Sequence, residues 1–166
     1  MGNLQLTSPA FSDGGEMDRG FGYKNRNISP PLSIQMGENS DTKSLSIIMD
    51  DPDAMGAVGK VWVHWVVWNI VPAEPNGFFG VGFNTKFKGA IEGMTDFGEV
   101  GYGGPAPPDK RHTYVFKLYA LDTKLDLTHG PYNFRSRHRI KKPVIEKAME
   151  GHIIEQATLT GTYAPD

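Results

Sequence analysis

The sequence predicts a mainly β protein, an antiparallel β-sandwich with one short helix near the C-terminus. Glycine and proline together make up 32 of the 166 residues, above the roughly 12% usual for the two. Both residues interrupt helices and mark turns, so a helical bundle is excluded. Nine Phe, six Tyr and three Trp supply the bulky surface that a two-sheet core needs. No linker or repeat divides residues 1–166, and we expect one domain.

The first two predicted strands lie near the middle of the chain. Ser44–Met49 (SLSIIM) is the first, and Pro52 must end it because proline lacks an N–H and restrains the preceding residue. Val61–Ile70 (VWVHWVVWNI) is the strongest, and it is apolar on both faces, as in a central strand that is covered on both sides. Side chains alternate along a strand. This alternation predicts that His64 shares a face with Trp62, Val66 and Trp68.

The rest of the chain predicts a strand, a helix and a final strand, separated by long turn-rich segments. Residues 1–43 are turn-rich, and residues 72–112 are mostly loop. A loop of this length within a compact domain more often has a function than not. Thr113–Leu121 is a strand with Tyr114, Phe116 and Leu118 on one face. The helix has Pro143 in its first turn, Val144, Ile145, Ala148 and Met149 on one face, and Gly151 as its stop. The last strand is His152–Tyr163.

Composition excludes several classes of protein. The formal net charge of −2 gives no electrostatic case for nucleic-acid binding. The absence of cysteine excludes disulfides, a thiol nucleophile and thiolate metal sites. The start of the chain has no secretory pattern, and the longest apolar run is too short to span a bilayer, so we expect a soluble cytoplasmic protein without integral membrane association.

Three features of the sequence carry potential chemistry. They are an acidic turn with Asp50, Asp51 and Asp53, a histidine (His64) within an apolar strand, and the pair His112 and Tyr114 at a strand entrance. A buried imidazole needs a hydrogen-bond partner. A core histidine that is satisfied by a backbone carbonyl is the simplest interpretation of His64. His112 and Tyr114 support the alternative interpretation, in which His64 belongs to a functional site.

A rigid loop precedes His112. Pro105, Pro107 and Pro108 fix three φ angles, so this loop can line a pocket at little cost in ordering. Gly103 and Gly104 allow the backbone to approach a ligand closely and offer amide donors to an anion. These residues suit the wall of an anion-binding pocket, and a tight connection between strands is the simpler alternative.

Three other interpretations remain open from the residues alone. Asp51, Asp53, His64 and His112 are conceivable metal ligands, but they lack the spacing of a helical metal site. A hydrolase or isomerase that uses His64 or His112 as acid and base is a second possibility, although the chain has no nucleophile elbow. The basic residues between Arg135 and Lys142 could contact an anionic partner, or simply lead into the helix in solvent.

The motifs, in their order, resemble the phosphatidylethanolamine-binding protein family, also called the Raf kinase inhibitor protein family, and its bacterial and archaeal branch most of all. The likeness runs from about residue 5 to residue 163. The matching pieces are Phe11-Ser-Asp-Gly-Gly15, Ser29-Pro-Pro-Leu32, Asp50-Asp-Pro-Asp-Ala54, Val63-His-Trp65, Gly101-Tyr-Gly-Gly-Pro-Ala-Pro-Pro108, His112-Thr-Tyr-Val-Phe116 and Tyr119-Ala-Leu-Asp122. Each motif is weak alone, but seven in register are specific.

The resemblance implies a β-sandwich with a small cavity for phosphate, phosphorylethanolamine or similar anions, with no cofactor, no metal and no assigned reaction. Family members also inhibit kinases or proteases, and family dimers imply a homodimer. Carried over by motif, the ligand-binding residues are Asp51, Asp53, His64, Gly104, Pro105, Ala106, His112 and Tyr114. The chain departs from the family pattern at Met55, where proline is usual, at Ala106, where cysteine or proline is frequent, and at Thr113, where arginine is usual; Val63 agrees with the prokaryotic form.

The aspartate of this pocket would repel an anion. Its presence makes sense if Asp51 keeps a histidine protonated, or if it accepts from the ammonium group of a zwitterionic headgroup. Two histidines and a tyrosine hydroxyl would bind a phosphate through charge-assisted hydrogen bonds. After desolvation, an affinity of about −4 to −6 kcal/mol is expected for so small a ligand.

Overall fold

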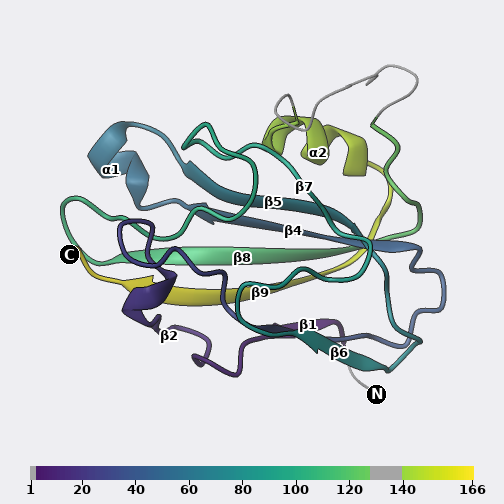
Figure 1. The fold of residues 1–166 in the computed structure, drawn as a ribbon. Coiled ribbons are helices and arrows are strands. Elements are labelled where there is room, and N and C mark those ends of the chain that lie inside the picture. Colours follow the sequence, from purple (N-terminus) through teal and green to yellow (C-terminus); the bar gives the residue numbers. More distant parts are fainter. Residues whose placement is uncertain (1–2, 128–139) are drawn as a thin grey trace.

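The computed structural model of the chain describes residues 3–127 and 140–166, and two β-sheets pack face to face in it (Figure 1). The larger sheet has the strand order β2-β9-β8-β4-β5-β7 and the smaller sheet β1-β3-β6. In chain order, the strands are β1 (Gln5–Thr7), β2 (Gly15–Glu16), β3 (Leu32–Gln35), β4 (Ser44–Asp51), β5 (Trp62–Ile70), β6 (Phe78–Val81), β7 (Ile91–Glu92), β8 (His112–Leu121) and β9 (Ile153–Tyr163). The helices are the 3-10 turn η1 (Arg19–Phe21), α1 (Ala54–Val58) and α2 (Lys142–Met149).

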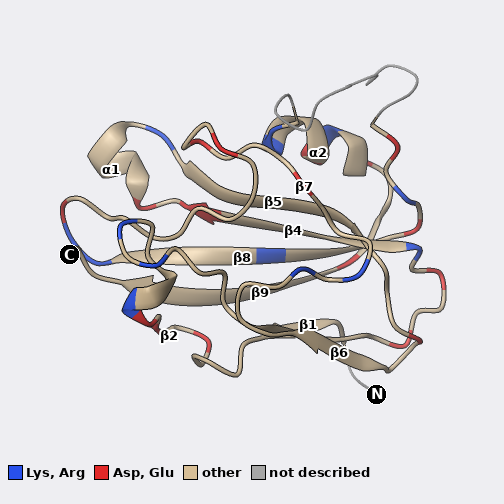
Figure 2. Ribbon diagram, in the orientation of Figure 1, with Lys and Arg blue, Asp and Glu red and all other residues tan. Residues whose placement is uncertain are grey.

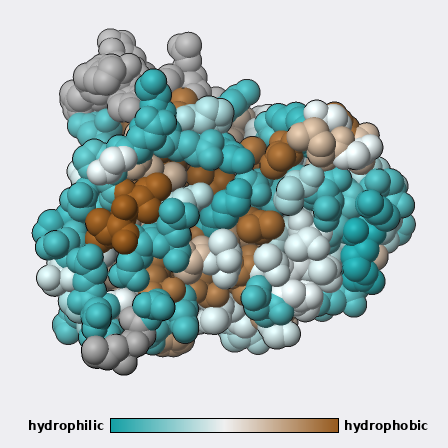
Figure 3. All heavy atoms as spheres, turned by 180° about the vertical axis from the view of Figure 1, so that it is seen from behind, coloured by the Kyte–Doolittle hydropathy of each residue, from teal (hydrophilic) through white to brown (hydrophobic). Residues whose placement is uncertain are grey.

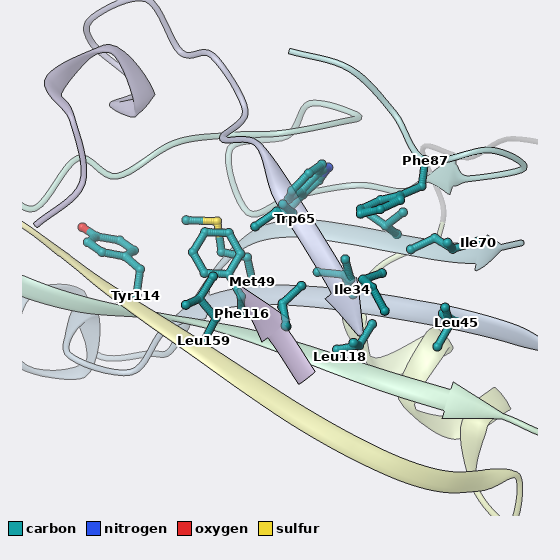
Figure 4. Packing of buried hydrophobic residues seen from close by; sticks show 14 of the residues in the cluster. Ile34, Leu45, Met49, Trp65, Ile70, Phe87, Tyr114, Phe116, Leu118 and Leu159 are labelled. Atoms are coloured by element: carbon teal, nitrogen blue, oxygen red, sulfur yellow. The ribbon is translucent and has the colours of Figure 1, made fainter. Parts of the chain in front are cut away.

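The main core lies between the two sheets. It is built from inward-facing side chains of β1 and β3 on one side and of β4, β5 and β8 on the other. Figure 4 shows part of this cluster, with Phe116, Met49 and Trp65 near its middle. Tyr114 lies at one end of the cluster, and its hydroxyl points away from the other labelled residues (Figure 4). The hydroxyl of Tyr114, on β8, therefore lies at the end of the main core.

A second core covers the opposite face of the larger sheet. Ile145 and Met149 of α2 pack there against Ile48, Val66 and Trp68. Every residue of β4 is buried, because this strand lies between β5 and β8 and is covered on both faces. This double cover explains why β4 and β5 are apolar on both faces.

The predicted β-sandwich is confirmed, and so are its long strands and the helix near the C-terminus. The observed strands β4, β5, β8 and β9 match the predicted ranges closely. Pro143 lies in the first turn of α2, and Gly151 follows the helix with a φ of 79°. Three features differ from the sequence-based expectation. The pairing of β2 with β9 is parallel, residues 72–112 contain the short strands β6 and β7, and α1 follows the acidic turn.

His64 shares the predicted face with Trp62, since both rings contact Phe97, but not with Val66 and Trp68, because a β-bulge interrupts the alternation of β5. Met49 pairs with Trp65, whereas the next residue, Asp50, pairs with Val63. His64 is therefore an extra residue with no partner on β4. A bulge changes the direction of a side chain. Val66 and Trp68 accordingly belong to the second core, under α2. The His64 ring lies on the other face, in edge-to-face contact with Tyr114 at 5.1 Å between centroids.

Charged residues of both signs lie mainly in the loops and near the strand ends, while α1 carries none (Figure 2). From behind, hydrophobic residues appear as separate patches among hydrophilic ones (Figure 3). The large hydrophobic side chains that are most exposed belong to Phe78, Phe83, Met55 and Val58. Among the helices in the described parts of the chain, none has the length and apolar character that crossing a membrane requires. Arg135, Arg137 and Arg139 of the basic stretch lie outside the described residues.

Removing a ring from the main core should destabilise the protein strongly. Phe116 is fully buried at the centre of β8. We expect Phe116→Ala to lower the free energy of unfolding by about 3–5 kcal/mol, through lost burial and the cavity left behind. Urea unfolding followed by tryptophan fluorescence measures this. The control, Phe78→Ala, changes a side chain that is 65% exposed and should cost less than about 0.5 kcal/mol. Equal losses for the two variants would contradict the assigned core.

Candidate functional site

A cavity of about 140 Å³ lies at one end of the larger sheet, next to α1 (Figure 1). Side chains from the ends of β4, β5 and β8 form part of its wall, and α1 and the 97–108 loop complete it. Its lining residues are Asp51, Ala54, Ala57, Val58, Trp62, His64, Phe97, Ala106, Pro108, His112 and Tyr114. The walls are mainly apolar, with a small set of polar groups from the strands. Ligand sites usually combine these two features.

His112 is held between two carboxylates. Its Nδ1 lies 2.6 Å from Oδ2 of Asp51, and its Nε2 lies 2.7 Å from Oδ1 of Asp109. Ionised carboxylates only accept hydrogen bonds, so both ring nitrogens donate and the ring is an imidazolium. Neither nitrogen of His112 is therefore free for a ligand. This differs from the expectation that His112 binds an anion directly.

The electrostatics of this array follow from burial and from the two hydrogen bonds. Burial opposes the charged form of His112, but the hydrogen bonds to Asp51 and Asp109 outweigh it and raise its pKa. Burial raises the pKa of Asp51, while the hydrogen bond to His112 opposes that rise. For Asp109 burial raises the pKa, but the hydrogen bond to His112 and the backbone amides of Asp109 and Lys110 together lower it. Two carboxylates around one imidazolium leave the array with a net negative charge.

His64 is the second histidine of the cavity, and it is neutral. Its Nδ1 donates to the carbonyl oxygen of Gly103 at 2.6 Å, because a carbonyl only accepts. Burial lowers the pKa of His64 to about 4. The simplest interpretation of this residue, a buried histidine that bonds a backbone carbonyl, is thus confirmed for Nδ1. The ring still lines the cavity, with Nε2 as the unprotonated nitrogen.

Three buried polar atoms of the cavity wall have no partner within hydrogen-bond geometry. They are Oδ1 of Asp51, Nε1 of Trp62 and the hydroxyl of Tyr114. In the described parts of the chain, one other buried polar side-chain atom, Oγ of Ser46, also lacks a hydrogen-bond partner. Burial, and then the charge of Asp51, raise the pKa of Tyr114, so its hydroxyl keeps its proton. Unpartnered buried polar groups are costly and rare. Their concentration around one cavity points to a ligand that supplies the missing partners.

The structure brings five of the eight predicted binding residues to the cavity wall. These are Asp51, His64, Ala106, His112 and Tyr114. The other three are not part of the described wall. Asp53 is exposed, and its Oδ2 accepts from the amide of Thr113 at 2.8 Å. Gly104 and Pro105 are buried behind the wall.

The glycines of the loop serve packing. The amide of Gly103 donates to the carbonyl of His64 at 2.8 Å, and the amide of Gly104 donates to Oδ1 of Asn27 at 2.8 Å. A Cβ at Gly104 would lie 1.8 Å from the carbonyl oxygen of Phe21, so no larger residue fits there. Both amides are therefore engaged within the protein. The expectation that they are free donors for an anion is wrong.

Sequence reasoning missed several residues of the site. Trp62 and Phe97 contribute rings to the wall, and α1 contributes Ala54, Ala57 and Val58. Asp109 is the second carboxylate on His112. The position of Asp109, three residues before His112, is a weak signal from which this hydrogen bond could have been suggested. Nothing in the sequence indicates that Phe97, within a glycine-rich loop, reaches the cavity.

A metal centre is not favoured by these residues. No group of three His, Cys, Asp or Glu side chains within residues 3–127 and 140–166 is arranged to hold a metal ion. Among the four residues that the sequence offered, Asp53 bonds a backbone amide and both nitrogens of His112 are engaged by carboxylates. The donor set therefore does not fit a cation such as zinc.

The buried neutral His64 should make the protein sensitive to acid. The pKa of His64 is about 4 in the folded chain and 6.5 in the unfolded chain, so the unfolded state binds more protons between these values. This contribution to stability is present above pH 6.5 and is lost as the pH falls through 4, by about 3 kcal/mol. In urea unfolding at pH 7 and pH 4.5, His64→Asn, which can still donate to Gly103, should lose less stability than the unmodified protein.

The exposed His152 is the control for this measurement, and His152→Asn should leave the acid sensitivity unchanged. A carbon-bound proton of His64 that titrates above pH 6 by NMR would contradict the assigned environment.

Comparison with known proteins agrees with this fold. The family model for phosphatidylethanolamine-binding proteins matches residues 7–164. A UPF0098 protein of the archaeon Methanothermobacter thermautotrophicus is 42% identical over 161 residues, which cover 96% of this chain and 98% of that protein. A UPF0098 protein of the bacterium Chlamydia muridarum is 38% identical over 165 residues, covering 98% and 100% of the two chains.

Solved structures give the same result. A crystal structure described as that of a phosphatidylethanolamine-binding protein homolog from Chlamydia trachomatis superposes with a TM-score of 0.83 at 35% identity, covering 100% of both chains. Escherichia coli YbcL superposes with a TM-score of 0.77 at 28% identity, covering 99% of this chain and 100% of YbcL. The seven motifs, the sandwich and these matches all agree, and the chain belongs to the phosphatidylethanolamine-binding protein family.

Proposed function

We propose that this protein is a non-enzymatic binding protein whose cavity holds a small phosphoryl group, such as phosphate or phosphorylethanolamine, in a form that still carries a proton. The observation that carries the proposal is the group of three unpartnered polar atoms on Asp51, Trp62 and Tyr114 around one cavity. A protonated phosphoryl group offers a partner to each of them. Its oxygens accept from the indole N–H and the phenol, and its hydroxyl donates to the carboxylate.

The proton on the ligand follows from the charges of the wall. None of the described residues that line the cavity is a lysine or an arginine. His64 is neutral, and the charge of His112 is directed at two carboxylates. A phosphate dianion would meet Asp51 with no compensating cation, and like charges repel at this distance. One proton between Oδ1 of Asp51 and the ligand removes this repulsion.

The affinity should be modest. Three hydrogen bonds from neutral or shared-proton groups contribute about 0.5–1.5 kcal/mol each. Desolvation of the phosphoryl group and loss of its freedom oppose binding. Dissociation constants in the millimolar to high micromolar range are expected, which is about −4 to −6 kcal/mol.

The geometry does not favour the hydrolase or isomerase alternative. A general base needs a free nitrogen with a pKa near the working pH. Both nitrogens of His112 are occupied by Asp51 and Asp109, and burial lowers the pKa of His64 to about 4. The arrangement is better suited to holding a ligand than to moving protons on it.

Two further expectations stay predictions from the family resemblance. They are inhibition of a kinase or a protease through the rim of the cavity and a homodimer, and the cytoplasmic location stays a prediction from the sequence pattern. The role of the basic stretch up to Lys142 also stays a prediction.

Binding of a phosphomonoester should strengthen as the pH falls. The monoanion predominates below its second pKa of about 6, and the raised pKa of Asp51 acts in the same direction. We expect phosphorylethanolamine to bind at least about tenfold more tightly at pH 5.5 than at pH 8. Amide NMR titrations at the two pH values measure this ratio, with shifts confined to residues of the cavity.

Asp51→Asn tests the shared proton. Its amide can accept from His112 and donate to a dianion, so binding at pH 8 should strengthen and the pH dependence should shrink. The matched control is Asp122→Asn, a carboxylate that also bonds a histidine but is exposed, far along the sheet. Tighter binding of the unmodified protein at pH 8 than at pH 5.5 would overturn the proposal.

Tyr114→Phe should weaken binding without weakening the fold. The hydroxyl has no protein partner within hydrogen-bond geometry, although the Asp51 carboxyl and the Ala106 amide act on its pKa, so its loss should change the free energy of unfolding little. The affinity for phosphorylethanolamine should drop about two- to tenfold, as expected for one lost hydrogen bond of about 0.5–1.5 kcal/mol. Calorimetric titration and urea unfolding measure the two effects.

Tyr163→Phe is the matched control, because its hydroxyl bonds Asn25 and the carbonyl of Arg19. It should show the opposite pattern, with lower stability and unchanged binding. A Tyr114→Phe variant that binds normally would count against the hydroxyl as a ligand contact.

A further inference from the structure

The cavity has a polar inner end and an apolar outer end. Asp51 and Tyr114 are 3% and 0% exposed, and the unpartnered Nε1 of the half-buried Trp62 is itself buried, so the groups that can bond a phosphoryl group lie deep. Val58 and Pro108 line the same cavity and are exposed, which places them at its opening. A phosphoryl group that reaches the inner end therefore carries its substituent past these apolar side chains.

Helix α1 continues the apolar surface outward from the opening. Its sequence, AMGAV, contains no charged residue, and α1 is drawn without charge colour in Figure 2. Met55 and Val58 are 54% and 52% exposed and lie three residues apart, so they are neighbours on the helix surface. We call Met55, Val58 and Pro108 the apolar lip. Exposed large apolar side chains beside a cavity indicate contact with an apolar partner.

An ammonium group on the substituent would meet carboxylates that already have partners. Asp53 and Asp109 each adjoin a lining residue, and they accept hydrogen bonds from the amide of Thr113 and from His112. The single carboxylate in the described lining is Asp51, and its two oxygens face His112 and the proposed phosphoryl proton. The ring of Trp62 could attract a cation, but Nζ of Lys60 already lies 5.7 Å from its centroid. A second cation beside that ring would be repelled. The exposed apolar side chains of the lip thus favour carbon at the opening.

We infer that the ligand class of this cavity is phosphate monoesters with a short apolar substituent, which lies along the apolar lip, in preference to phosphorylethanolamine. This inference rests on the proposed function, because it assumes that the phosphoryl group occupies the inner end. It assigns specificity to Met55, which stands where the family motif has proline, and to Val58. A cavity of about 140 Å³ suits a phosphoryl group with a few carbons, since a cavity of roughly 150 Å³ admits a benzene ring.

Two nearly isosteric ligands test the preference directly. Propyl phosphate and phosphorylethanolamine differ at the end of the chain, where a methyl group replaces an ammonium group. We expect propyl phosphate to bind at least about fourfold more tightly at pH 5.5, the effect of one buried carbon. Competition of both ligands in one NMR titration gives the ratio of their dissociation constants.

The possible outcomes separate this inference from the proposed function. If phosphorylethanolamine binds as tightly as propyl phosphate or more tightly, the apolar class is overturned while phosphoryl binding stands. If neither ester nor inorganic phosphate shifts any resonance of the cavity at 20-fold the expected millimolar dissociation constant, the proposed function itself fails.

Substitutions on α1 test the lip. Met55→Gln and Val58→Thr replace exposed side chains with polar ones of similar size, and each should reduce the preference for propyl phosphate by about twofold or more. The control, Val71→Thr, changes a valine that is 37% exposed and does not line the cavity, and it should keep the full preference. An unchanged preference in both α1 variants would exclude the lip as the source of specificity.

Discussion

Two consecutive buried carboxylates at the end of β4 organise this molecule. Asp50 and Asp51 are 1% and 3% exposed, and side chains of neighbouring strand residues point to opposite faces. A buried carboxylate is stable only with a partner. Asp50 binds Lys117 and Lys142 on the α2 face, and Asp51 binds His112 on the cavity face. The same pair of charges thus attaches α2 to the sheet and fixes the histidine that closes the site.

Charge compensation also decides the chemistry of the cavity. Both N–H groups of the His112 imidazolium donate to carboxylates, one to Asp51 and one to Asp109. His64 stays neutral because it is buried and bonds a backbone carbonyl. In the proposed function, recognition then depends on an indole N–H, a phenol and one carboxylate oxygen. Such a site discriminates by where the ligand carries its proton and by the character of its substituent. A site of lysines and arginines would instead respond to total negative charge.

The sequence predicted the fold better than the site. Long β-branched and aromatic segments give strong periodic signals, and β4, β5, β8 and β9 appear where expected. Short elements such as α1 and β7 carry too few residues for a signal. In the site, Tyr114 followed from alternation along an uninterrupted strand. His64 reached the same cavity for a different reason, because one extra residue in β5 reversed its face, and no periodic rule places such a bulge.

The sequence by itself determined the sandwich, the family and the identity of the polar groups at the entrance of β8, because local patterns and motif order carry that information. Tertiary structure alone decided how those groups are used. It paired both nitrogens of His112 with carboxylates and engaged the amides of Gly103 and Gly104 within the protein. It also brought Trp62 and α1 to the cavity wall. Hydrogen-bond partners and solvent access depend on segments far apart in the chain, and no local pattern encodes them.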